Sequence, residues 1–315
     1  MIVALAGGVG AARMLVALSR VVDASQITAV VNTGDDTVMH GLHVSPDLDT
    51  VTYTLAEMIN PETGWGLAGE TWSAMEQLRA YSAGRLGWFN LGDKDLGTHL
   101  YRTTRLSEGA TLSEVTSEIA ARWGVEVKLL PMSDSRVETR VLVKGTGGAT
   151  EDIAFQEYFV GRRHSVEVVG VRFAGIDEAA PAPGVLDAIA AAETLVICPS
   201  NPVVSIGPVL GTGGIGEAVA ARRDHCVAVS PIIAGRALKG PADRMLAELG
   251  HEPSVVGVAR MWSPYAATLV IDEADRALSG DVERCGVRPV VTRTVMSGPS
   301  ESAALAEVVV GSVKR

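Results

Sequence analysis

Short apolar runs alternate with segments of helical periodicity along the whole chain. Residues 2–6, 27–31 and 194–198 form largely apolar runs, which are typical of strands buried on both faces of a sheet. Further strands are predicted at 125–130, 226–229, 255–259, 267–271 and 287–292. Helices are predicted at 14–18, 45–60, 69–83, 112–123, 184–191, 215–222, 241–249 and 300–311. This alternation predicts a doubly wound α/β fold with a mostly parallel, Rossmann-like sheet.

One region departs from this alternation. Between residues 137 and 173, apolar residues recur at every second position, which indicates strands on either side of a predicted helical stretch at 151–160. We therefore interpret residues 1–315 as a single Rossmann-like domain, in which residues 131–180 are a candidate for a smaller inserted α/β subdomain.

Composition narrows the class of protein. Hydrophobic residues make up 47% of the chain but aromatic residues only 4%, so the core must be built from Ala, Val, Leu and Ile. The net charge of −10 argues against a nucleic-acid partner, because binding to phosphate backbones depends mostly on Lys and Arg. Cys198, Cys226 and Cys285 are scattered, and they predict neither a disulfide framework nor a zinc site. No apolar run approaches the roughly 18 residues that span a bilayer, so we expect no membrane partner. The first residues lack the basic region of a signal peptide, so we expect a cytoplasmic protein.

Four carboxylates lie close together after the second predicted strand. Asp35 and Asp36 occupy a loop, and Asp47 and Asp49 fall in the first turn of the next predicted helix, which Ser45 is expected to cap. Like charges at such spacing repel by about 1 kcal/mol per pair in water, and more where water is excluded. The stretch therefore indicates a divalent cation, and Mg²⁺ carrying a phosphate ligand is the first candidate. Taken alone, Asp47 and Asp49 are also explained as acids that complement the helix dipole.

A glycine-rich turn follows the first predicted strand. Gly7, Gly8 and Gly10 lead into a helix, an arrangement whose backbone N–H groups receive phosphate. Arg13 stands where the full dinucleotide-binding pattern has a third glycine, and the ending of the Walker pattern is missing. The turn is therefore either a phosphate loop or a tight strand-to-helix connection. Because the first two strands are expected to be neighbours, this turn and the acidic loop should meet at one edge of the sheet, where ligands bind in open α/β folds.

Two further segments carry candidate ligand-binding groups. Aromatic residues at 88–89 precede a polar cluster with Lys94 and His99, which suits a planar ligand that bears an anionic group. The same segment is explained as a hydrophobic plug and a helix capped by Asp93 or Asp95, with Lys94 in a surface ion pair and His99 in a structural role.

The second of these segments is the loop at 199–208. It follows a predicted strand and carries amide, hydroxyl and backbone groups suited to a base and its phosphates. The glycines at 211–216 are discounted as a dinucleotide loop, because they do not directly follow a strand.

Several blocks of sequence occur in a family-specific order along nearly the whole chain. They are Ala6–Arg13, Val31–Asp36, Ser45–Val51, Gly92–His99, Leu130–Asp134, Pro199–Pro202, Ser205–Pro208 and Val229–Ile233. Together they resemble the 2-phospho-L-lactate transferases of deazaflavin coenzyme F-420 biosynthesis, in the actinobacterial phosphoenolpyruvate transferase form. The resemblance implies that a guanosine diphosphate-linked three-carbon acid donates its phospho-acid group to the ribityl hydroxyl of 7,8-didemethyl-8-hydroxy-5-deazariboflavin. It further implies release of GMP, formation of coenzyme F-420-0 or its dehydro form, and Mg²⁺ as the metal.

The resemblance also places Asp49 and Lys94 at positions that the family uses to hold the deazaflavin. The other roles are hypotheses from the chemistry of displacement at phosphorus, which depends on positioning and charge neutralisation. Asp49 is the candidate to orient or deprotonate the ribityl hydroxyl with help from Asp36, and Asp35, Asp36 and Asp49 are the candidate metal ligands. The candidate substrate-binding residues are Gly7, Gly8, Gly10, Arg13, Asn32, Asp49, Lys94, Ser200, Asn201, Ser205 and Gly207.

Several alternatives stay open at this point. Trp65, Trp88 or Phe89 are candidates to cover the deazaflavin ring, and a place in the hydrophobic core explains each of them as well. A nucleotide-sugar-binding regulatory protein shares a glycine-rich first loop and an acidic second loop, and another Mg²⁺-dependent nucleotide-processing enzyme is a third reading. The donor acid is lactate or enolpyruvate, and the Ala-, Gly-, Val- and Arg-rich composition suggests an actinobacterium and so favours enolpyruvate. We expect a homodimer, as is common for such enzymes.

Overall fold

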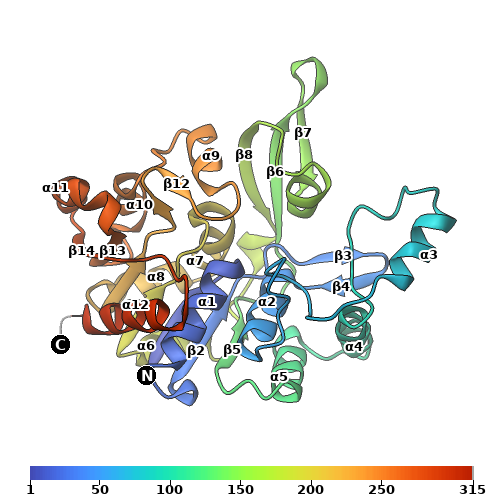
Figure 1. The fold of residues 1–315 in the computed structure, drawn as a ribbon, viewed down its shortest axis with the longest axis horizontal. Coiled ribbons are helices and arrows are strands. Elements are labelled where there is room, and N and C mark those ends of the chain that lie inside the picture. The colour runs from blue at the N-terminus through green and yellow to red at the C-terminus, as the bar shows by residue number, and fades with distance from the viewer. Residues whose placement is uncertain (314–315) are drawn as a thin grey trace.

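A parallel sheet of seven strands forms the centre of the molecule in the computed structural model, which describes residues 1–313. Its strand order is β14-β13-β10-β9-β1-β2-β5, so the chain begins in the middle and builds outward in both directions (Figure 1). From one edge to the other, the strands are β14 (Arg288–Thr292), β13 (Thr268–Asp272), β10 (Cys226–Val229), β9 (Thr194–Ile197), β1 (Ile2–Ala6), β2 (Ile27–Val31) and β5 (Lys128–Pro131). This topology confirms the predicted doubly wound, Rossmann-like α/β fold.

The side chains of β1 alternate between the two faces of the sheet and begin two hydrophobic cores. Val3 and Leu5 belong to one core, and Ile2, Ala4 and Ala6 belong to the other. The helices of the first core are α6 (Val185–Ala191), α7 (Gly207–Gly211), α8 (Ile215–Ala221), α9 (Ala242–Glu248), α10 (Val255–Trp262) and α11 (Ser279–Arg284). Those of the second core are α1 (Gly8–Ser19), α2 (Pro46–Leu55), α5 (Leu112–Arg122) and α12 (Pro299–Gly311). Because both faces are covered, the central strands appear in the sequence as continuous apolar runs.

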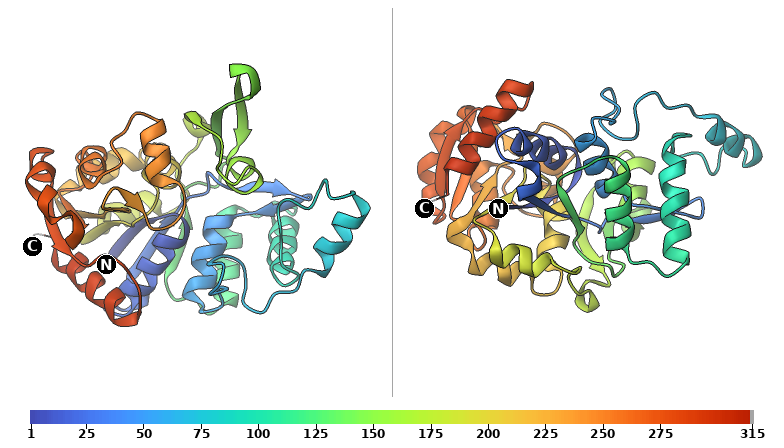
Figure 2. Two further views of the ribbon diagram at one scale, coloured as in Figure 1. Left: turned by 45° about the horizontal axis from the view of Figure 1, so that its top comes forward. Right: turned by 90° about the horizontal axis from the view of Figure 1, so that it is seen from below.

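Smaller elements stand beside the central sheet (Figures 1 and 2). They are the hairpin of β3 (Thr37–Met39) and β4 (Leu42–Val44), the antiparallel sheet of β6 (Glu138–Lys144), β7 (Thr150–Ala154) and β8 (Val168–Ala174), and the hairpin of β11 (Ile232–Ile233) and β12 (Arg236–Ala237). Helices α3 (Ser73–Tyr81) and α4 (Asp95–Ser107) lie beside the first hairpin. The three-stranded sheet lies within residues 131–180, the candidate inserted subdomain, and projects from the rest of the molecule (Figure 1).

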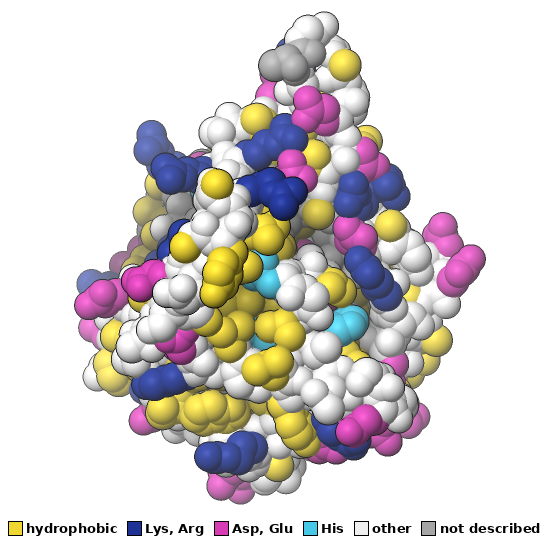
Figure 3. All heavy atoms as spheres, turned by 90° about the vertical axis from the view of Figure 1, so that its right-hand side faces the viewer, with side chains coloured by type: hydrophobic (Ala, Val, Ile, Leu, Met, Phe, Trp, Pro, Cys, Tyr) yellow, Lys and Arg dark blue, Asp and Glu magenta, His cyan; other side chains and the backbone are white. Residues whose placement is uncertain are grey.

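Apolar side chains are exposed on the side of the molecule that carries α3, α4 and the first hairpin. Val38 on β3, Tyr81 on α3, and Leu100 and Tyr101 on α4 are between 44% and 85% exposed. Figure 3 shows hydrophobic and histidine side chains gathered on this side.

Within residues 1–313, no single helix has the length and apolar character needed to cross a membrane. One pair of helices bent by 93°, Pro202–Gly211 and Ile215–Ala221, meets the criteria of length and composition together.

The strand predicted at 255–259 is wrong, because these residues begin helix α10. Ser254 caps the helix, since its Oγ accepts hydrogen bonds from the N–H groups of Val256 at 3.1 Å and Gly257 at 3.2 Å. A short valine-rich run has the same apolar pattern in a buried helix and in a buried strand. The hydroxyl before the run is the signal that favours the helix.

The helical stretch predicted at 151–160 is confirmed only in its second half. Residues 150–154 form β7, in which Ile153 pairs with Val141 of β6, and residues 155–161 are helical, with a π-helical turn at Glu157–Gly161. Ile153 packs into a small core of its own with Val141 and Val168, and this core selects the strand.

Helix α2 is shorter than the predicted 45–60. It ends at Leu55, and Glu57 then takes a left-handed φ of 57° that stops the helix. The predicted cap is wrong too, because the Ser45 hydroxyl donates to Asp36 Oδ2 at 2.7 Å. The side chain of Ser45 therefore joins the helix start to the acidic loop.

Candidate active site

A cavity of about 740 Å³ lies at the carboxyl ends of the central strands. Its lining includes the turn after β1, with Gly7, Gly8 and Gly10, and the loop after β9, with Ser200 and Asn201. The chain leaves β1 toward β2 on one side and returns through β9 on the other, so the cavity lies at the point where the strand order reverses. Ligands bind at this point in doubly wound folds.

The glycines after β1 are required by the backbone geometry. Gly8 has a φ of 71°, and a Cβ on Gly7 would lie 2.8 Å from Ser205 Cβ. A Cβ on Gly10 would overlap the carbonyl oxygen of Pro199. Helix α1 starts within this turn, with no side-chain cap on Gly7 and no acidic residue in its first turn. Its first N–H groups, which the helix itself cannot satisfy, are therefore suited to an anion in the cavity.

Asn32 orders the acidic loop that follows β2. Its Nδ2 donates to Asp47 Oδ2 at 2.9 Å, and its Oδ1 accepts the N–H of Gly34 at 2.8 Å. Asn32 is fully buried and does not line the cavity. Asn32 therefore positions Asp47, which lines the cavity together with Asp35.

The carboxyl groups of this loop are held in an environment that disfavours their charge. Burial raises the pKa of Asp35 well above its ordinary value, and the carboxylates of Asp47 and Asp36 add to the effect. Burial also raises the pKa of Asp36 well above its usual range. It raises the pKa of Asp47 to about 6, although hydrogen bonds from Asn32 and Gly8 oppose the shift. A bound cation would relieve this repulsion.

The residues fit a magnesium ion that is shared with a phosphate. Asp35 Oδ1 and Asp36 Oδ1 are buried and have no hydrogen-bond partner among the described residues. Nowhere in residues 1–313 do three His, Cys, Asp or Glu side chains converge into a group that holds a metal by itself. Mg²⁺ is typically held by one or two carboxylates together with substrate phosphates, so these two free oxygens are a suitable donor set.

An Asp47→Asn variant is expected to gain stability relative to the wild type as the pH rises. Because the pKa of about 6 lies above the ordinary 3.8, protonated Asp47 stabilises the fold fully below pH 3.8, and this contribution is lost as the pH rises through about 6. Asparagine does not titrate and still accepts the hydrogen bond from Asn32. The difference in free energy of unfolding should grow by up to about 3 kcal/mol between about pH 4 and pH 7.5. Urea unfolding in EDTA at several pH values measures it, and a pH-independent difference would contradict the raised pKa.

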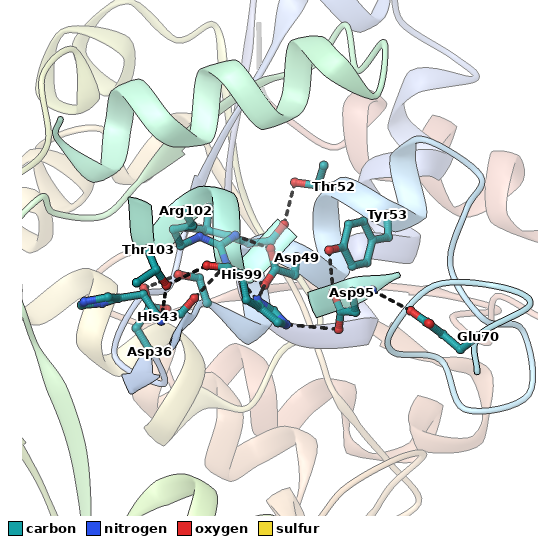
Figure 4. A network of polar contacts seen from close by, with 12 residues as sticks. Asp36, His43, Asp49, Thr52, Tyr53, Glu70, Asp95, His99, Arg102 and Thr103 are labelled. Carbon is teal, nitrogen blue, oxygen red and sulfur yellow. Dashed lines mark hydrogen bonds and ion pairs between the residues drawn. The ribbon is translucent and has the colours of Figure 1, made fainter. Parts of the chain in front are cut away.

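Asp49 is held by a buried ion pair between α2 and α4 (Figure 4). Its Oδ2 accepts from Arg102 Nη1 at 3.1 Å, and its Oδ1 accepts from Arg102 Nη2. Asp49 is 6% exposed and Arg102 is 2% exposed. Burial alone would lower the pKa of the Arg102 guanidinium, but the carboxylates of Asp49 and Asp36 outweigh it and raise the pKa. Both oxygens of Asp49 therefore already have partners.

A chain of polar contacts continues from this pair along α4. His99 lies between two carboxylates, with Nδ1 at 3.8 Å from Asp49 Oδ2 and Nε2 at 3.3 Å from Asp95 Oδ2. The Tyr53 hydroxyl donates to Asp95 Oδ1 at 2.6 Å. Burial and the carboxylates of Asp49 and Asp95 raise the pKa of Tyr53, so its phenol stays protonated. Tyr53, Asp95 and His99 all line the cavity, so the wall near Asp49 is a connected polar network.

Arg102 was not predicted as a site residue. Its partner Asp49 is 53 positions away in the sequence, and an arginine on a helix is usually exposed. The available signal is the spacing of Asp95, His99 and Arg102, which places them on one face of a helix.

Lys94 is not one of the described residues that line the cavity. Its ammonium donates to the carbonyl of Ala68 at 2.9 Å, and the side chain is exposed. Its role in ligand binding stays a prediction.

The caps expected near Lys94 are arranged differently from the prediction. Glu70 accepts the N–H groups of Lys94 at 2.8 Å and Asp95 at 2.9 Å, and so closes the start of α4. Asp93 instead accepts from the N–H groups at the start of α3, those of Ser73 and Ala74, both at 3.0 Å. Each carboxylate thus caps the helix at the other end of the connecting segment.

The loop after β9 supplies the opposite wall. Ser200 Oγ is buried without a partner among the described residues, and Ser205 lines the cavity as predicted. Asn201 Oδ1 accepts from the N–H groups of Val203 and Val204 and starts a π-helical turn, where a loop was predicted. Gly207 begins α7 outside the cavity lining.

Most predicted site residues therefore meet in one cavity. Those that line it are Gly7, Gly8, Gly10, Arg13, Asp35, Asp49, Ser200, Asn201 and Ser205, and those outside its lining are Asn32, Asp36, Lys94 and Gly207. Asp36 instead lines a small neighbouring cavity against β6.

Aromatic rings line another part of the cavity. Trp65 and Trp88 are 45% and 40% exposed, whereas Phe89 is largely buried. Phe155 and Phe159, from the segment after β7, also line it and stack on each other with centroids 5.5 Å apart. These two rings were not predicted, because the segment was assigned to a helix of the insertion. The flat face of Phe159, which is 36% exposed, is suited to a planar ligand, whereas Phe155 is buried behind it.

The fold and the cavity define a protein of the doubly wound α/β class, in which a glycine-rich turn and buried carboxylates line one cavity. Comparison with known proteins gives the family. The sequence model described as 2-phospho-L-lactate transferase CofD matches residues 2–292, so the chain belongs to this family. It is a transferase of coenzyme F-420 biosynthesis, as the sequence blocks predicted.

Curated relatives and a solved structure extend the comparison. The chain is 46% identical over 306 residues to the phosphoenolpyruvate transferase of Streptomyces griseus, covering 97% of this chain and 96% of the relative. It is 40% identical over 319 residues to the phosphoenolpyruvate transferase of Mycolicibacterium smegmatis, covering 96% of each. Protein BH3568 from Bacillus halodurans superposes with a TM-score of 0.61 and 98% coverage of both chains. At 18% identity, that likeness concerns the fold alone.

Proposed function

We propose that this chain transfers the phosphoenolpyruvyl group of a guanosine diphosphate-linked donor to the ribityl hydroxyl of 7,8-didemethyl-8-hydroxy-5-deazariboflavin and releases GMP. One observation supports the proposal most. The glycine turn, the Ser200 loop and the carboxylates of Asp35 and Asp49 all line the same cavity. The names of the curated relatives favour enolpyruvate over lactate as the acid. A homodimer and a cytoplasmic location stay predictions.

In the proposed reaction, the ribityl oxygen forms a bond to the phosphorus that carries the three-carbon acid, and the bond from that phosphorus to GMP breaks. Asp49, whose carboxylate is fixed by Arg102, accepts a hydrogen bond from the hydroxyl, orients it and takes its proton as the bond to phosphorus forms. The N–H groups at Gly8 and Gly10, together with Arg13, bind the phosphates of the donor.

The other groups complete the donor site. Ser200, whose hydroxyl lacks a partner among the described residues, and Asn201 receive the guanosine end. Asp35 and Asp36 would hold Mg²⁺, and the ion would supply charge neutralisation at the diphosphate. We assign contact with the deazaflavin ring to Trp65, Trp88 and Phe159, which all line the cavity.

The direct test is turnover of defined substrates. We expect the purified chain, given Mg²⁺, the deazariboflavin acceptor and the guanylylated phosphoenolpyruvate donor, to release GMP and yield an acceptor whose mass has gained the phosphoenolpyruvyl group. EDTA should abolish the reaction, and the phospholactate donor should react more slowly. If the acceptor neither binds, as followed by its fluorescence, nor reacts, the proposal fails and a nucleotide-sugar-binding protein becomes the reading to test.

A further inference from the structure

The cavity is lined by both acidic and basic side chains. Among its described lining residues, the carboxylates are Asp35, Asp47, Asp49 and Asp95, and the Lys or Arg residues are Arg13 on α1 and Lys239 on the segment between β12 and α9. Arg13 belongs to the predicted phosphate site. Lys239 was not predicted, and nothing described so far gives it a role.

The ammonium of Lys239 lies close to the glycine-rich turn. A Cβ built on Gly64 would lie 3.2 Å from Lys239 Nζ and 3.8 Å from Val9 Cγ1. Val9 stands between the two glycines that open α1, so the ammonium is brought near the start of this helix. Three segments far apart in the sequence therefore meet around one positive charge.

This charge has no protein partner. The other lysines whose contacts are known are engaged, since Lys144 pairs with Glu167 and Lys94 donates to Ala68. Within residues 1–313, Lys239 makes neither an ion pair nor a hydrogen bond, although the cavity contains carboxylates. An exposed, strongly hydrated ammonium with three free donors is suited to a phosphate that enters from solvent.

The backbone that carries Lys239 is anchored. β11 and β12 form a hairpin in which Ile232 pairs with Ala237, and the N–H of Ala234 donates to the buried Asp275 Oδ2 at 2.9 Å. After Lys239, Gly240 takes a φ of 71° that allows the chain to turn into α9. The lysine is thus presented by a short segment whose base is fixed.

We propose that Lys239 is a donor-binding residue whose ammonium binds a phosphate oxygen of the donor's diphosphate near the start of α1. This inference rests on the proposed function and adds a residue to its donor site. As the bond from phosphorus to GMP breaks, the leaving phosphate gains negative charge, and the ammonium offsets that charge.

The test compares GDP binding by the wild type, Lys239→Gln and Lys239→Arg. Arg236→Gln is the matched control, because Arg236 is an exposed cation of the same hairpin outside the cavity lining. Titration calorimetry with GDP and Mg²⁺ is expected to show a loss of affinity of about 10- to 100-fold for Lys239→Gln, as for other charge-assisted hydrogen bonds. Lys239→Arg should retain most of the affinity, and Arg236→Gln should match the wild type.

Two further measurements distinguish a direct contact between Lys239 and the donor from a general disturbance of the cavity. In Lys239→Gln, the KM for the donor should rise, and the affinity for the deazariboflavin, followed by fluorescence, should be unchanged. The inference is overturned if Lys239→Gln binds GDP as the wild type does, or if Arg236→Gln loses as much affinity. If the wild type itself binds no GDP, the donor assignment of the proposed function fails as well, so the two failures are distinguishable.

Discussion

An Asp49→Asn variant is expected to transfer the phospho-acid group at least about 100-fold more slowly than the wild type, the scale of losing a positioned proton acceptor. Asparagine has nearly the same shape, but its amide has one acceptor oxygen where the carboxylate has two. One of the two Arg102 contacts then brings an NH₂ group against a guanidinium donor. The side chain can no longer offer the ribityl hydroxyl a charged acceptor in a fixed position.

The measurement is kcat with both substrates saturating, together with GDP affinity. We expect kcat to fall and GDP affinity to stay near the wild-type value, because Asp49 acts on the acceptor. Asp224→Asn, which changes a largely exposed carboxylate outside the cavity lining, serves as the control and should be fully active. Normal turnover by Asp49→Asn would remove Asp49 from the mechanism.

Replacing Arg102 by methionine is expected to destabilise the fold by about 3–5 kcal/mol, the cost of removing one partner of a buried ion pair. The reason is that Asp49 would remain as a buried charge, with His99 as its nearest polar neighbour. Burial of Asp36 would also become more costly, because Arg102 helps to lower the pKa of that carboxyl.

The matched control is Arg105→Met on the same helix. Arg105 pairs with Glu108 and Glu118, but that pair is partly exposed, so water replaces the lost contact and the change should be far smaller. Urea unfolding followed by tryptophan fluorescence measures both variants. The double variant Asp49→Asn, Arg102→Met should recover part of the stability, because it leaves no buried charge alone. If Arg102→Met and Arg105→Met lowered the free energy of unfolding equally, burial of the ion pair with Asp49 would not be the cause of the destabilisation.

The central sheet was predictable because its strands are buried on both faces. Such strands are apolar throughout, and the runs at 2–6, 27–31 and 194–198 contain β1, β2 and β9. The same property explains the error at 255–259, since apolar composition alone does not distinguish a buried strand from a buried helix turn. The error at 151–154 arose because β7 pairs only with β6 in a small separate sheet, and its pattern is too short to be recognised.

The site was predictable where the topology determines it. Parallel strands that are neighbours carry their following loops to one edge, so the turn at Gly7 and the loop at Asp35 were expected to meet. Residues that act through a distant partner were not predictable in this way. Arg102 gains its role from Asp49 on another helix, and nothing in the local sequence distinguishes Lys239 from Arg236.

The exchange of caps by Glu70 and Asp93 has a consequence for how the family can diversify. The Thr71 hydroxyl also donates to Asp93 Oδ2 at 2.5 Å, and the Asp93 N–H donates to the Thr71 carbonyl at 2.9 Å. These hydrogen bonds join the two ends of the segment between Thr71 and Asp93. The residues within this segment, which include α3 and Trp88, can change in length and sequence without displacing Asp95, which follows the joined ends by two positions. Substitutions in this segment can therefore change the surface that Trp88 contributes to the cavity while Asp95 keeps its position in the cavity wall.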